Sequence, residues 1–364
     1  MGHEEEQYFY MQQLLAERTT PTVSPSGEIL VGSRNVYLYS LDLANGSFGL
    51  YRSGATPGHQ AYQCTLSPYL DSGGGLLSSC SGRGTDAGFG DRCGGNCAGW
   101  IYRNATLDSP AIRVAGPNTL VPAREIGTAV PPTVAAGAVA FTDAVGVLGQ
   151  GPDGTVWIVD GDVLWGLKDG TLHRVYQAPA DTPMMRGEDD DSAIGAVSTQ
   201  GTVVVPLRRR SGTYPDFFMH HLIAVNPDGT KAPFPIPATI PGVAGDPGSL
   251  AVSDIVSDNS GGFYIRAGEA SGEPIYPIAP RPTPLDGSAT HQYVLHVRDG
   301  KWNVVAESNV SILTLVNGKM SRTKPVDALK IPIFLPGTMA VLPGTLVLTD
   351  ANAGGYAMAV GIPR

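Results

Sequence analysis

Charged residues are scarce in this chain: Asp, Glu, Lys and Arg make up 16% of its 364 residues. No run of about 18 uninterrupted apolar residues occurs, so the sequence predicts no membrane span. The net charge is −9. A duplex-binding surface needs a basic stripe that displaces counterions from phosphates, and this balance has the wrong sign. The sequence therefore predicts no nucleic-acid partner, but it leaves enzymes and binding proteins equally open.

Two further signals are missing. Residues 1–6 are acidic and contain no apolar core of a secretory signal. No Gly-x-Ser-x-Gly motif stands between a predicted strand and a helix, so serine-hydrolase chemistry is not expected.

Cysteines are few, and all four lie close together: Cys64, Cys80, Cys93 and Cys97. Residues 78–99 are rich in Gly, Ser and Asp, and a loop that buries no core gains most from covalent cross-links. We predict two disulfides, with Cys64–Cys80 and Cys93–Cys97 as the most local of three connectivities. A zinc site and free thiols are the alternatives. Disulfides favour a secreted or extracytoplasmic protein, and the missing signal keeps a cytoplasmic one as the alternative.

Glycine (47 residues) and proline (30 residues) are abundant, together roughly a fifth of the chain. They separate copies of a recurring sequence pattern, in which a turn residue or glycine precedes alternating apolar residues and then an acidic residue. The clearest copies are 153–160 and 344–350, and looser copies start at Gly27, Gly201 and Gly261. Period-two alternation recurring about every 40–60 residues predicts one small antiparallel sheet per unit, and such units close into a β-propeller.

We therefore predict an all-β chain with a single β-propeller over 21–364 and a short N-terminal helix within 1–20. Six blades of antiparallel strands fit best, with five or seven as alternatives. The units span about 22–60, 61–115, 116–180, 192–240, 248–307 and 325–364. The helix is predicted over 4–18, where Tyr8, Met11 and Leu15 share one face. That apolar face either packs on the ring or docks a partner.

Two segments also resemble a known repeat family. Residues 152–160 (Pro-Asp-Gly-Thr-Val-Trp-Ile-Val-Asp) and 335–350 are similar to NHL-type propeller repeats, and 324–332 resembles their linker. The likeness covers about a third of the chain. The Asn-His-Arg turn usual in that family does not follow Asp350. The resemblance implies a propeller scaffold, and NHL-type rings are mostly binding modules with some enzymes among their relatives.

Loops held by a rigid scaffold usually carry function. The loops 78–99, 181–192, 208–217 and 270–290 are predicted to crowd one face of the ring and to recognise a protein or glycan partner, with the chain as a monomer. Trp100 and Tyr102 are expected to be exposed aromatics. His220 and His221 are adjacent on a predicted strand, so they should point to opposite faces. The candidate ligand-binding residues are Trp100, Tyr102, Arg208, Arg209, Tyr214, Phe217 and His220.

The alternative function is a metal-dependent propeller enzyme, lyase- or lactonase-like, with a divalent ion in the central channel. The acidic run 188–191 predicts either a solvated loop or a Ca²⁺ or Mg²⁺ site with Glu188, Asp189 and Asp191 as ligands. Conceivable lactonase-type ligands are Glu28, Asn226, Asp254 and Asn259. Asp160 and Asp350 each follow a strand and are expected to cap a tight turn. Trp157, Trp165 and Trp302 are expected in the core between blades.

Overall fold

The structure is a computed structural model. It describes residues 22–23, 29–32, 37–42, 47–53, 69–80, 93, 96–105, 109–185, 193–208, 217–269, 292–306, 311–316, 319–322, 338–350 and 356–361. Over these ranges the chain is all-β, apart from the short 3-10 helices η1 (Ala136–Ala138) and η2 (Pro247–Ser249) and the helical residue Cys93. None of the helices found there could reach across a membrane. The predicted helix over 4–18 lies outside the described residues.

The strands of the first half form three small antiparallel sheets. The first contains β1 (Thr22–Val23), β2 (Ile29–Gly32), β3 (Tyr37–Asp42) and β4 (Ser47–Ser53). The second contains β5 (Tyr69–Leu70), β6 (Leu76–Cys80), β7 (Trp100–Asn104) and β8 (Ala111–Ala115). The third pairs β10 (Val145–Gln150), β11 (Val156–Asp160), β12 (Val163–Lys168), β13 (Thr171–Gln177) and, at its outer edge, β9 (Thr133–Ala135).

The second half continues the pattern. One group contains β14 (Ala196–Val197), β15 (Val203–Arg208), β16 (Phe217–Val225) and β17 (Lys231–Pro233), and the next contains β18 (Ala251–Ser257), β19 (Phe263–Gly268), β20 (Gln292–Arg298) and β21 (Lys301–Ala306). A single register pair, Phe218 with Ala251, joins these two groups. The last sheet has the order β23 (Lys319–Arg322), β22 (Ser311–Val316), β26 (Tyr356–Gly361), β25 (Thr345–Asp350) and β24 (Met339–Leu342).

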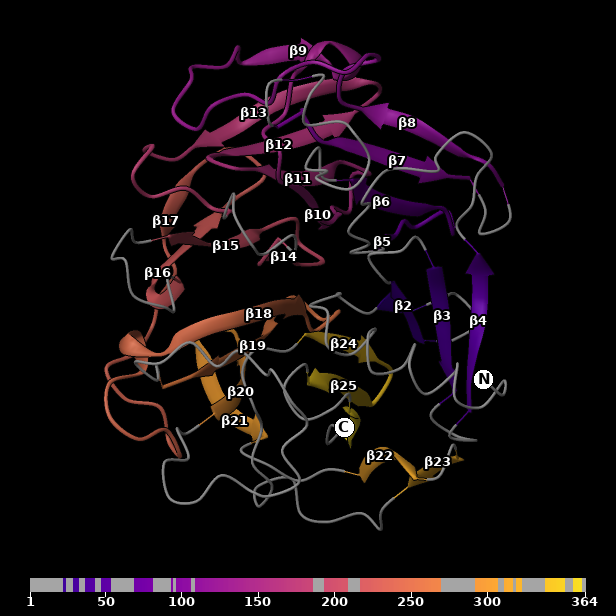
Figure 1. Cartoon of the computed structure of the whole chain (residues 1–364). Coiled ribbons are helices and arrows are strands. Elements are labelled where there is room, and N and C mark those ends of the chain that lie inside the picture. Colours follow the sequence, from indigo (N-terminus) through magenta and orange to yellow (C-terminus); the bar gives the residue numbers. More distant parts are fainter. Residues whose placement is uncertain are drawn as a thin grey trace.

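The sheets surround a common centre (Figure 1). The innermost strand of each sheet contacts the innermost strands of its two neighbours: β1 contacts β24 and β5, β10 contacts β5 and β14, and β18 contacts β14 and β24. This path returns to its starting strand, so the sheets form a closed ring in which the first and last sheets of the chain are neighbours. Antiparallel sheets closed around an axis are a β-propeller.

The core lies between neighbouring sheets. All five residues of β11 are buried, with Val156 and Ile158 in one apolar cluster and Trp157 and Val159 in the next. Successive side chains of a strand point to opposite faces, so a strand covered on both faces reads as a continuous apolar run. The three tryptophans predicted as core between blades are at most 8% exposed and confirm that prediction: Trp157, Trp165 and Trp302.

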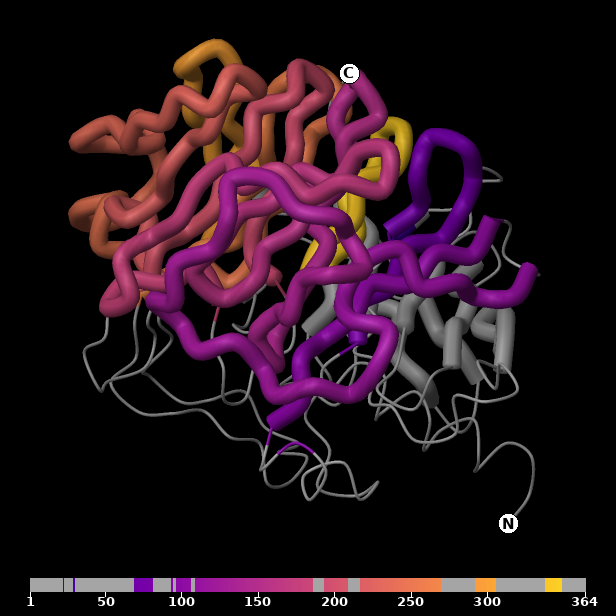
Figure 2. The backbone as a smooth tube through the Cα atoms, turned by 90° about the horizontal axis from the view of Figure 1, so that it is seen from above, coloured from indigo at the N-terminus to yellow at the C-terminus, as the bar shows by residue number. Residues whose placement is uncertain are grey.

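The two faces of the ring carry different connections. In a four-stranded meander, the turn between the first and second strands lies on the opposite face from the link between the second and third. The turns between the first and second strands are short: 71–75, 151–155, 198–202, 258–262 and 343–344. Four of these turns share one geometry, with glycine in the left-handed region at Gly74, Gly154, Gly201 and Gly261. Figure 2 shows the indigo hairpin of β5–β6 and the yellow hairpin of β24–β25 on the same side. We call this side the turn face.

The opposite side receives the longer connections, and we call it the loop face. The connections 81–99, 178–195, 209–216, 234–250 and 269–291 all begin and end at strand termini on this side. The four loops singled out from the sequence are therefore anchored on one face.

Candidate functional site

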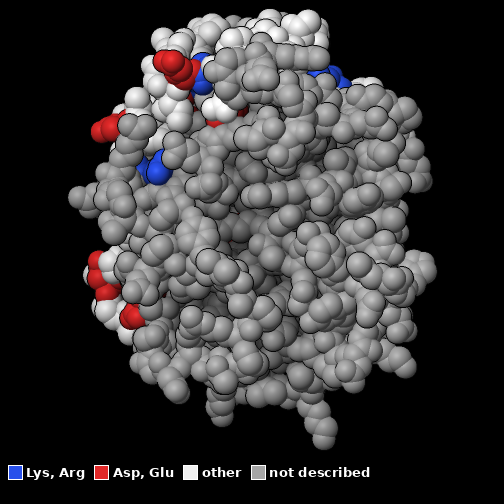
Figure 3. All heavy atoms as spheres, in the orientation of Figure 1, with Lys and Arg blue, Asp and Glu red and all other residues white. Residues whose placement is uncertain are grey.

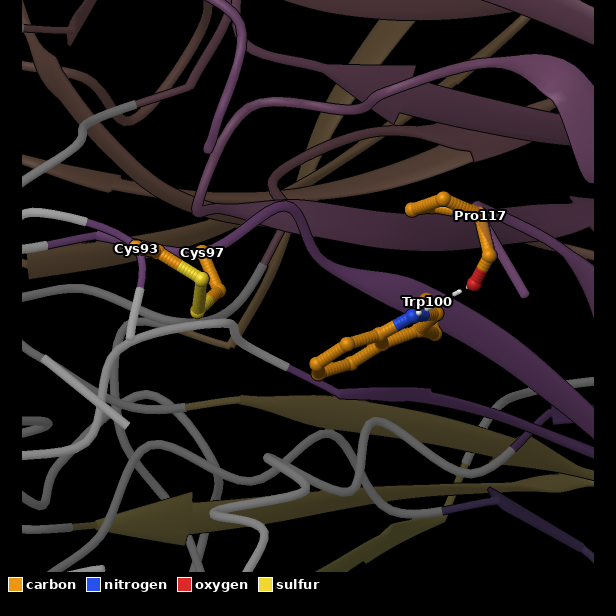
Figure 4. Close-up of a disulfide and its surroundings, with 4 residues drawn as sticks. All are labelled: Cys93, Cys97, Trp100 and Pro117. Carbon is orange, nitrogen blue, oxygen red and sulfur yellow. Dashed lines mark hydrogen bonds between the residues drawn. A yellow bond between two sulfur atoms is a disulfide. The ribbon is translucent and has the colours of Figure 1, made fainter. Parts of the chain in front are cut away.

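The described part of the loop face contains a disulfide, a buried cluster of charges and a β-bulge that holds aromatic rings. Cys93 and Cys97 form the disulfide at the end of the β6–β7 connection (Figure 4). Cys80 is disulfide-bonded as well, to a partner outside the described residues. The Cys93–Cys97 prediction is confirmed. Cys64 lies outside the described residues, and its pairing with Cys80 stays a prediction.

Peptide mapping of the unreduced protein checks this pairing. We expect a disulfide-linked species that joins the peptides of Cys64 and Cys80, and an internal cross-link between Cys93 and Cys97. The Cys97→Ser variant should leave the Cys64–Cys80 species unchanged, because the two cross-links close separate loops. A Cys64–Cys93 or Cys64–Cys97 species in the unreduced native protein would contradict the local connectivity.

Trp100 and Tyr102 lie beside this disulfide, but they are buried: 2% and 5% exposed. The expectation of exposed aromatics is therefore wrong. The Trp100 indole donates from Nε1 to Pro117 O at 3.0 Å (Figure 4). The Arg113 guanidinium lies 5.0 Å from the Trp100 ring and 5.6 Å from the Tyr102 ring. Both rings pack under a cation and buttress the base of the loop face.

The segment that ends the cysteine loop is hydrogen-bonded to the connection after β8. Ala98 N donates to Val121 O and Ala123 N donates to Asn96 O, each at 3.0 Å. Gly99 N donates to Thr142 O at 2.9 Å. These hydrogen bonds fix the disulfide region against the connection that leads into the neighbouring sheet.

Arg124 follows that segment and reaches two buried carboxylates, one at the end of β11 and one in the tight turn between β11 and β12. Its Nη2 lies 3.2 Å from Asp160 Oδ2 and 2.8 Å from Asp162 Oδ1. Both carboxylate side chains are 0% exposed, and the Arg124 side chain is 7% exposed. Two buried negative charges share one buried positive charge, so each contact matters for the stability of this face. We call these three residues the charge clamp.

Asp160 was expected to cap a tight turn by accepting from backbone N–H groups; its carboxylate does accept from one, but that group lies far from the turn after β11. Its Oδ1 accepts from Thr142 N, at 2.6 Å, and its Oδ2 from Trp165 Nε1, at 3.2 Å. Burial raises the pKa of Asp160, while the Arg124 charge and the hydrogen bonds from Thr142 and Trp165 oppose that rise. The carboxylate therefore joins separate segments.

Hydrogen bonds continue from the charge clamp towards β15. Met184 N and Met185 N both donate to Gly161 O, at 2.9 and 3.0 Å. Arg208 N then donates to Pro183 O at 2.7 Å. A chain of contacts thus runs across the loop face from Cys97, a predicted disulfide cysteine, to Arg208, a predicted ligand-binding residue.

The pairing between β15 and β16 is irregular. Pro206 pairs with Leu222 and Arg208 pairs with Phe217, so residues 218–221 bulge out between these pairs. The ring centroids of His220 and His221 lie 3.9 Å apart. These adjacent histidines were expected on opposite faces of a strand; that is wrong here because the bulge breaks the alternation.

The Phe218 ring stacks on His220 with centroids 5.8 Å apart. His220 is exposed, Phe218 is half-buried and Phe217 is buried. His220 Nδ1 lies 2.6 Å from Gly248 O, just before β18. We call Phe218, His220 and His221 the ring cluster.

Most of the remaining predicted site residues are not described by the structure. Arg209, Tyr214, Glu188, Asp189 and Asp191 lie outside the described residues, as does Glu28. Of the conceivable lactonase-type ligands, Asn226 and Asn259 lie in turns on the turn face. Asp254 lies on the innermost strand β18. Among the residues that the structure describes, no three His, Cys, Asp or Glu side chains gather closely enough to hold a metal ion. Ca²⁺ or Mg²⁺ binding stays a prediction.

A second buried charge pair lies between β18 and its neighbours. Asp254 is 3% exposed and accepts from Met339 N at 2.6 Å, across the boundary to the last sheet. Burial raises the pKa of Asp254 to about 7, against the hydrogen bonds from Met339 and Ile255 and the charge of Arg266. Arg266, its register partner on β19, is fully buried. Alternation alone could not separate this buried aspartate from the exposed ones.

The visible charge on one face is mixed. In Figure 3 the described acidic and basic atoms lie along the upper and left margins, with both signs present. The described part of this view shows no patch of a single sign.

No family model and no curated protein matches the chain. A solved structure of a protein of unknown function from Bacteroides thetaiotaomicron is 10% identical with a TM-score of 0.52, and the match covers 94% of this chain and 70% of that one. A streptogramin B lyase is 12% identical with a TM-score of 0.41, covering 94% and 93%. An oligogalacturonate lyase in complex with manganese is 13% identical with a TM-score of 0.48, covering 95% and 77%.

These likenesses concern the fold alone. Only the first of the three scores exceeds 0.5, and it agrees with the all-β ring over nearly the whole chain. Because folds of this kind host many chemistries, the two lyases decide nothing about the reaction or ligand of this chain. Membership of the NHL family stays a prediction.

Proposed function

We propose that the chain is a six-bladed β-propeller binding module that recognises a protein or glycan partner through its loop face. The blade number rests on the innermost strands, because the closed path of contacts passes through β1, β5, β10, β14, β18 and β24. The functional proposal rests on the difference in connection length between the two faces of the ring. Short turns close one face, whereas long connections are anchored on the other, which is the arrangement that presents variable segments on a rigid base.

The hydrogen-bonded path across the loop face supports the same proposal. Cys97, the charge clamp and Arg208 are joined through backbone and side-chain contacts, so the bases of several loops are held in one arrangement before any ligand arrives. Binding to a preorganised surface loses less conformational entropy than binding to free loops. An extracytoplasmic setting suits this surface, because the Cys93–Cys97 disulfide persists in oxidising compartments.

The alternative is the lyase- or lactonase-like enzyme with a divalent ion in the channel. It needs converging ligands, and a Ca²⁺ or Mg²⁺ ion retained by the purified chain would favour it. The binding module is preferred because the described contacts hold the bases of several loops in one arrangement, while the proposed metal ligands Glu188, Asp189 and Asp191 have no described geometry.

Matched charge reversals on the two faces test the binding proposal. The full chain is screened on a glycan array and a displayed peptide library, and the affinities of the hits are then measured for Arg208→Glu and Lys301→Glu. Arg208 lies at the loop face and Lys301 is exposed beside the turn of 299–300 on the turn face. We expect at least about tenfold weaker binding for Arg208→Glu and no change for Lys301→Glu, because reversing a charge within the binding surface replaces an attraction by a repulsion.

Two results would count against the proposal. Equal losses in both variants would show that binding is not confined to the loop face. An absence of specific hits in both screens, with the chain folded, would remove the support for a protein or glycan ligand.

A further inference from the structure

We propose that His220 and His221 form a binding site for a borderline divalent transition ion such as Zn²⁺, held at the rim of the loop face by two imidazoles. The site goes beyond the proposed binding function and does not depend on it. It is also distinct from the Ca²⁺ or Mg²⁺ hypothesis, since imidazole nitrogen suits zinc whereas those two ions prefer oxygen ligands.

The bulge is the first supporting observation. On a regular strand, neighbouring side chains point to opposite faces and could not share an ion. Here residues 218–221 have no register partner on β15, and the two imidazole centroids lie 3.9 Å apart at an interplanar angle of 55°. Two imidazoles this close together can share one ion.

The contact with Gly248 is the second observation. A carbonyl oxygen only accepts, so the 2.6 Å contact places the proton of His220 on Nδ1. Nε2 then carries the lone pair. Histidines that bind metals almost always donate their other N–H to a carbonyl or carboxylate in this way, which fixes the tautomer and orients the ring. His220 is therefore prepared as a ligand and is exposed enough to be reached.

Asp246 adds negative charge on the same side. A Cβ placed on Gly248 would lie 3.3 Å from both Asp246 Oδ1 and His220 Cβ, so the missing side chain lets these two residues approach each other. The Asp246 carboxylate accepts from Gly248 N at 3.0 Å, which holds it beside the carbonyl that orients His220. The negative charge of Asp246 favours a cation beside the two imidazoles, although Asp246 itself is not proposed as a ligand.

Two protein ligands leave coordination positions open. Zinc is usually tetrahedral, so water or a donor group of a bound molecule would complete the shell. The site requires one ring nitrogen of His221 for the ion and leaves the other for the contacts that this side chain makes. The proposed site would therefore present an ion with exchangeable positions on the loop face.

Zinc titration of the full metal-free chain tests the site without any partner molecule. Calorimetry of the wild type should show a saturable site of about one equivalent, and His220→Asn and His221→Asn should each weaken it at least about tenfold. His173→Asn is the matched control, because His173 is an exposed histidine on another sheet with no second imidazole among its described ring contacts. Cobalt substitution should give absorption bands of a nitrogen-containing shell that both rim variants lose.

Circular dichroism and thermal unfolding establish that each variant is folded. If either rim variant unfolds, the corresponding glutamine variant replaces it. The proposal is overturned if the wild type has no saturable zinc site, if the rim variants bind zinc as tightly as the wild type, or if His173→Asn weakens binding equally. Since no partner is present, these outcomes leave the loop-face binding proposal to be judged by its own charge-reversal experiment.

Discussion

Replacing Arg124 with alanine is expected to lower the free energy of unfolding by about 3–5 kcal/mol, the usual effect of removing one partner from a buried ionic group. The reason is the charge clamp: Asp160 and Asp162 are both 0% exposed and share the Arg124 guanidinium. Without Arg124, two buried carboxylates would face each other with only hydrogen bonds to stabilise them. Urea unfolding at neutral pH, followed by tryptophan fluorescence, measures the change.

Two comparisons distinguish the clamp from ordinary surface ion pairs. Lys168→Ala removes an ion pair with Asp153 in which both side chains are largely exposed, and it should change stability by under about 1 kcal/mol. Adding Asp162→Asn to Arg124→Ala should recover part of the loss, since one uncompensated charge disappears. If Arg124→Ala costs no more than Lys168→Ala, the clamp does not stabilise the loop face.

Asp254→Asn is expected to remove a strong pH dependence of stability. The pKa of Asp254 is raised from 3.8 to about 7 by burial, so the folded state favours the neutral acid. A group whose pKa is raised on folding stabilises fully below its unfolded pKa, and this contribution is lost as the pH rises through the folded pKa. Wild type should therefore lose up to roughly 4 kcal/mol relative to Asp254→Asn between about pH 4 and pH 7.

Urea midpoints of both proteins at several pH values test this directly. Asparagine imitates the neutral acid, and its amide oxygen can still accept from Met339 N, so the two proteins should be similar near pH 4. Asp153→Asn is the control, because hydrogen bonds from Thr155 and Lys168 lower the pKa of Asp153 to about 2. Its contribution has the opposite sign and is lost as the pH falls. A difference between wild type and Asp254→Asn that is constant with pH would contradict the prediction.

Much of the strand pattern was predictable because it depends on local alternation. The segments around Ile29, Trp157, Val203 and Tyr356 were identified as strands, and each is one. The strands β22 and β23 were missed, and the last sheet begins before residue 325 as a result. The sequence does contain a local signal for them, because Asn317-Gly318 stands between the runs 311–316 and 319–322 and is typical of a hairpin turn. Only the pairing of β22 with β26 places this hairpin in the last sheet.

The candidate site was predictable only in part. The clustered cysteines indicated the Cys93–Cys97 disulfide from spacing alone. The sequence could not indicate Arg124, because its carboxylate partners lie 36 and 38 positions away and no local pattern links them. The proximity of His220 to His221 was likewise hidden, since a bulge depends on which residues of the opposite strand find partners.

The sequence by itself determined the all-β class, the repeated small sheets and the apolar strands between them, because turn residues and period-two alternation act over a few neighbouring residues. Only the tertiary structure decided which charges are buried and which distant side chains meet. Those properties arise when distant segments meet around a closed ring, where burial and long-range hydrogen bonds such as that from Met339 to Asp254 depend on neighbours that no local pattern specifies.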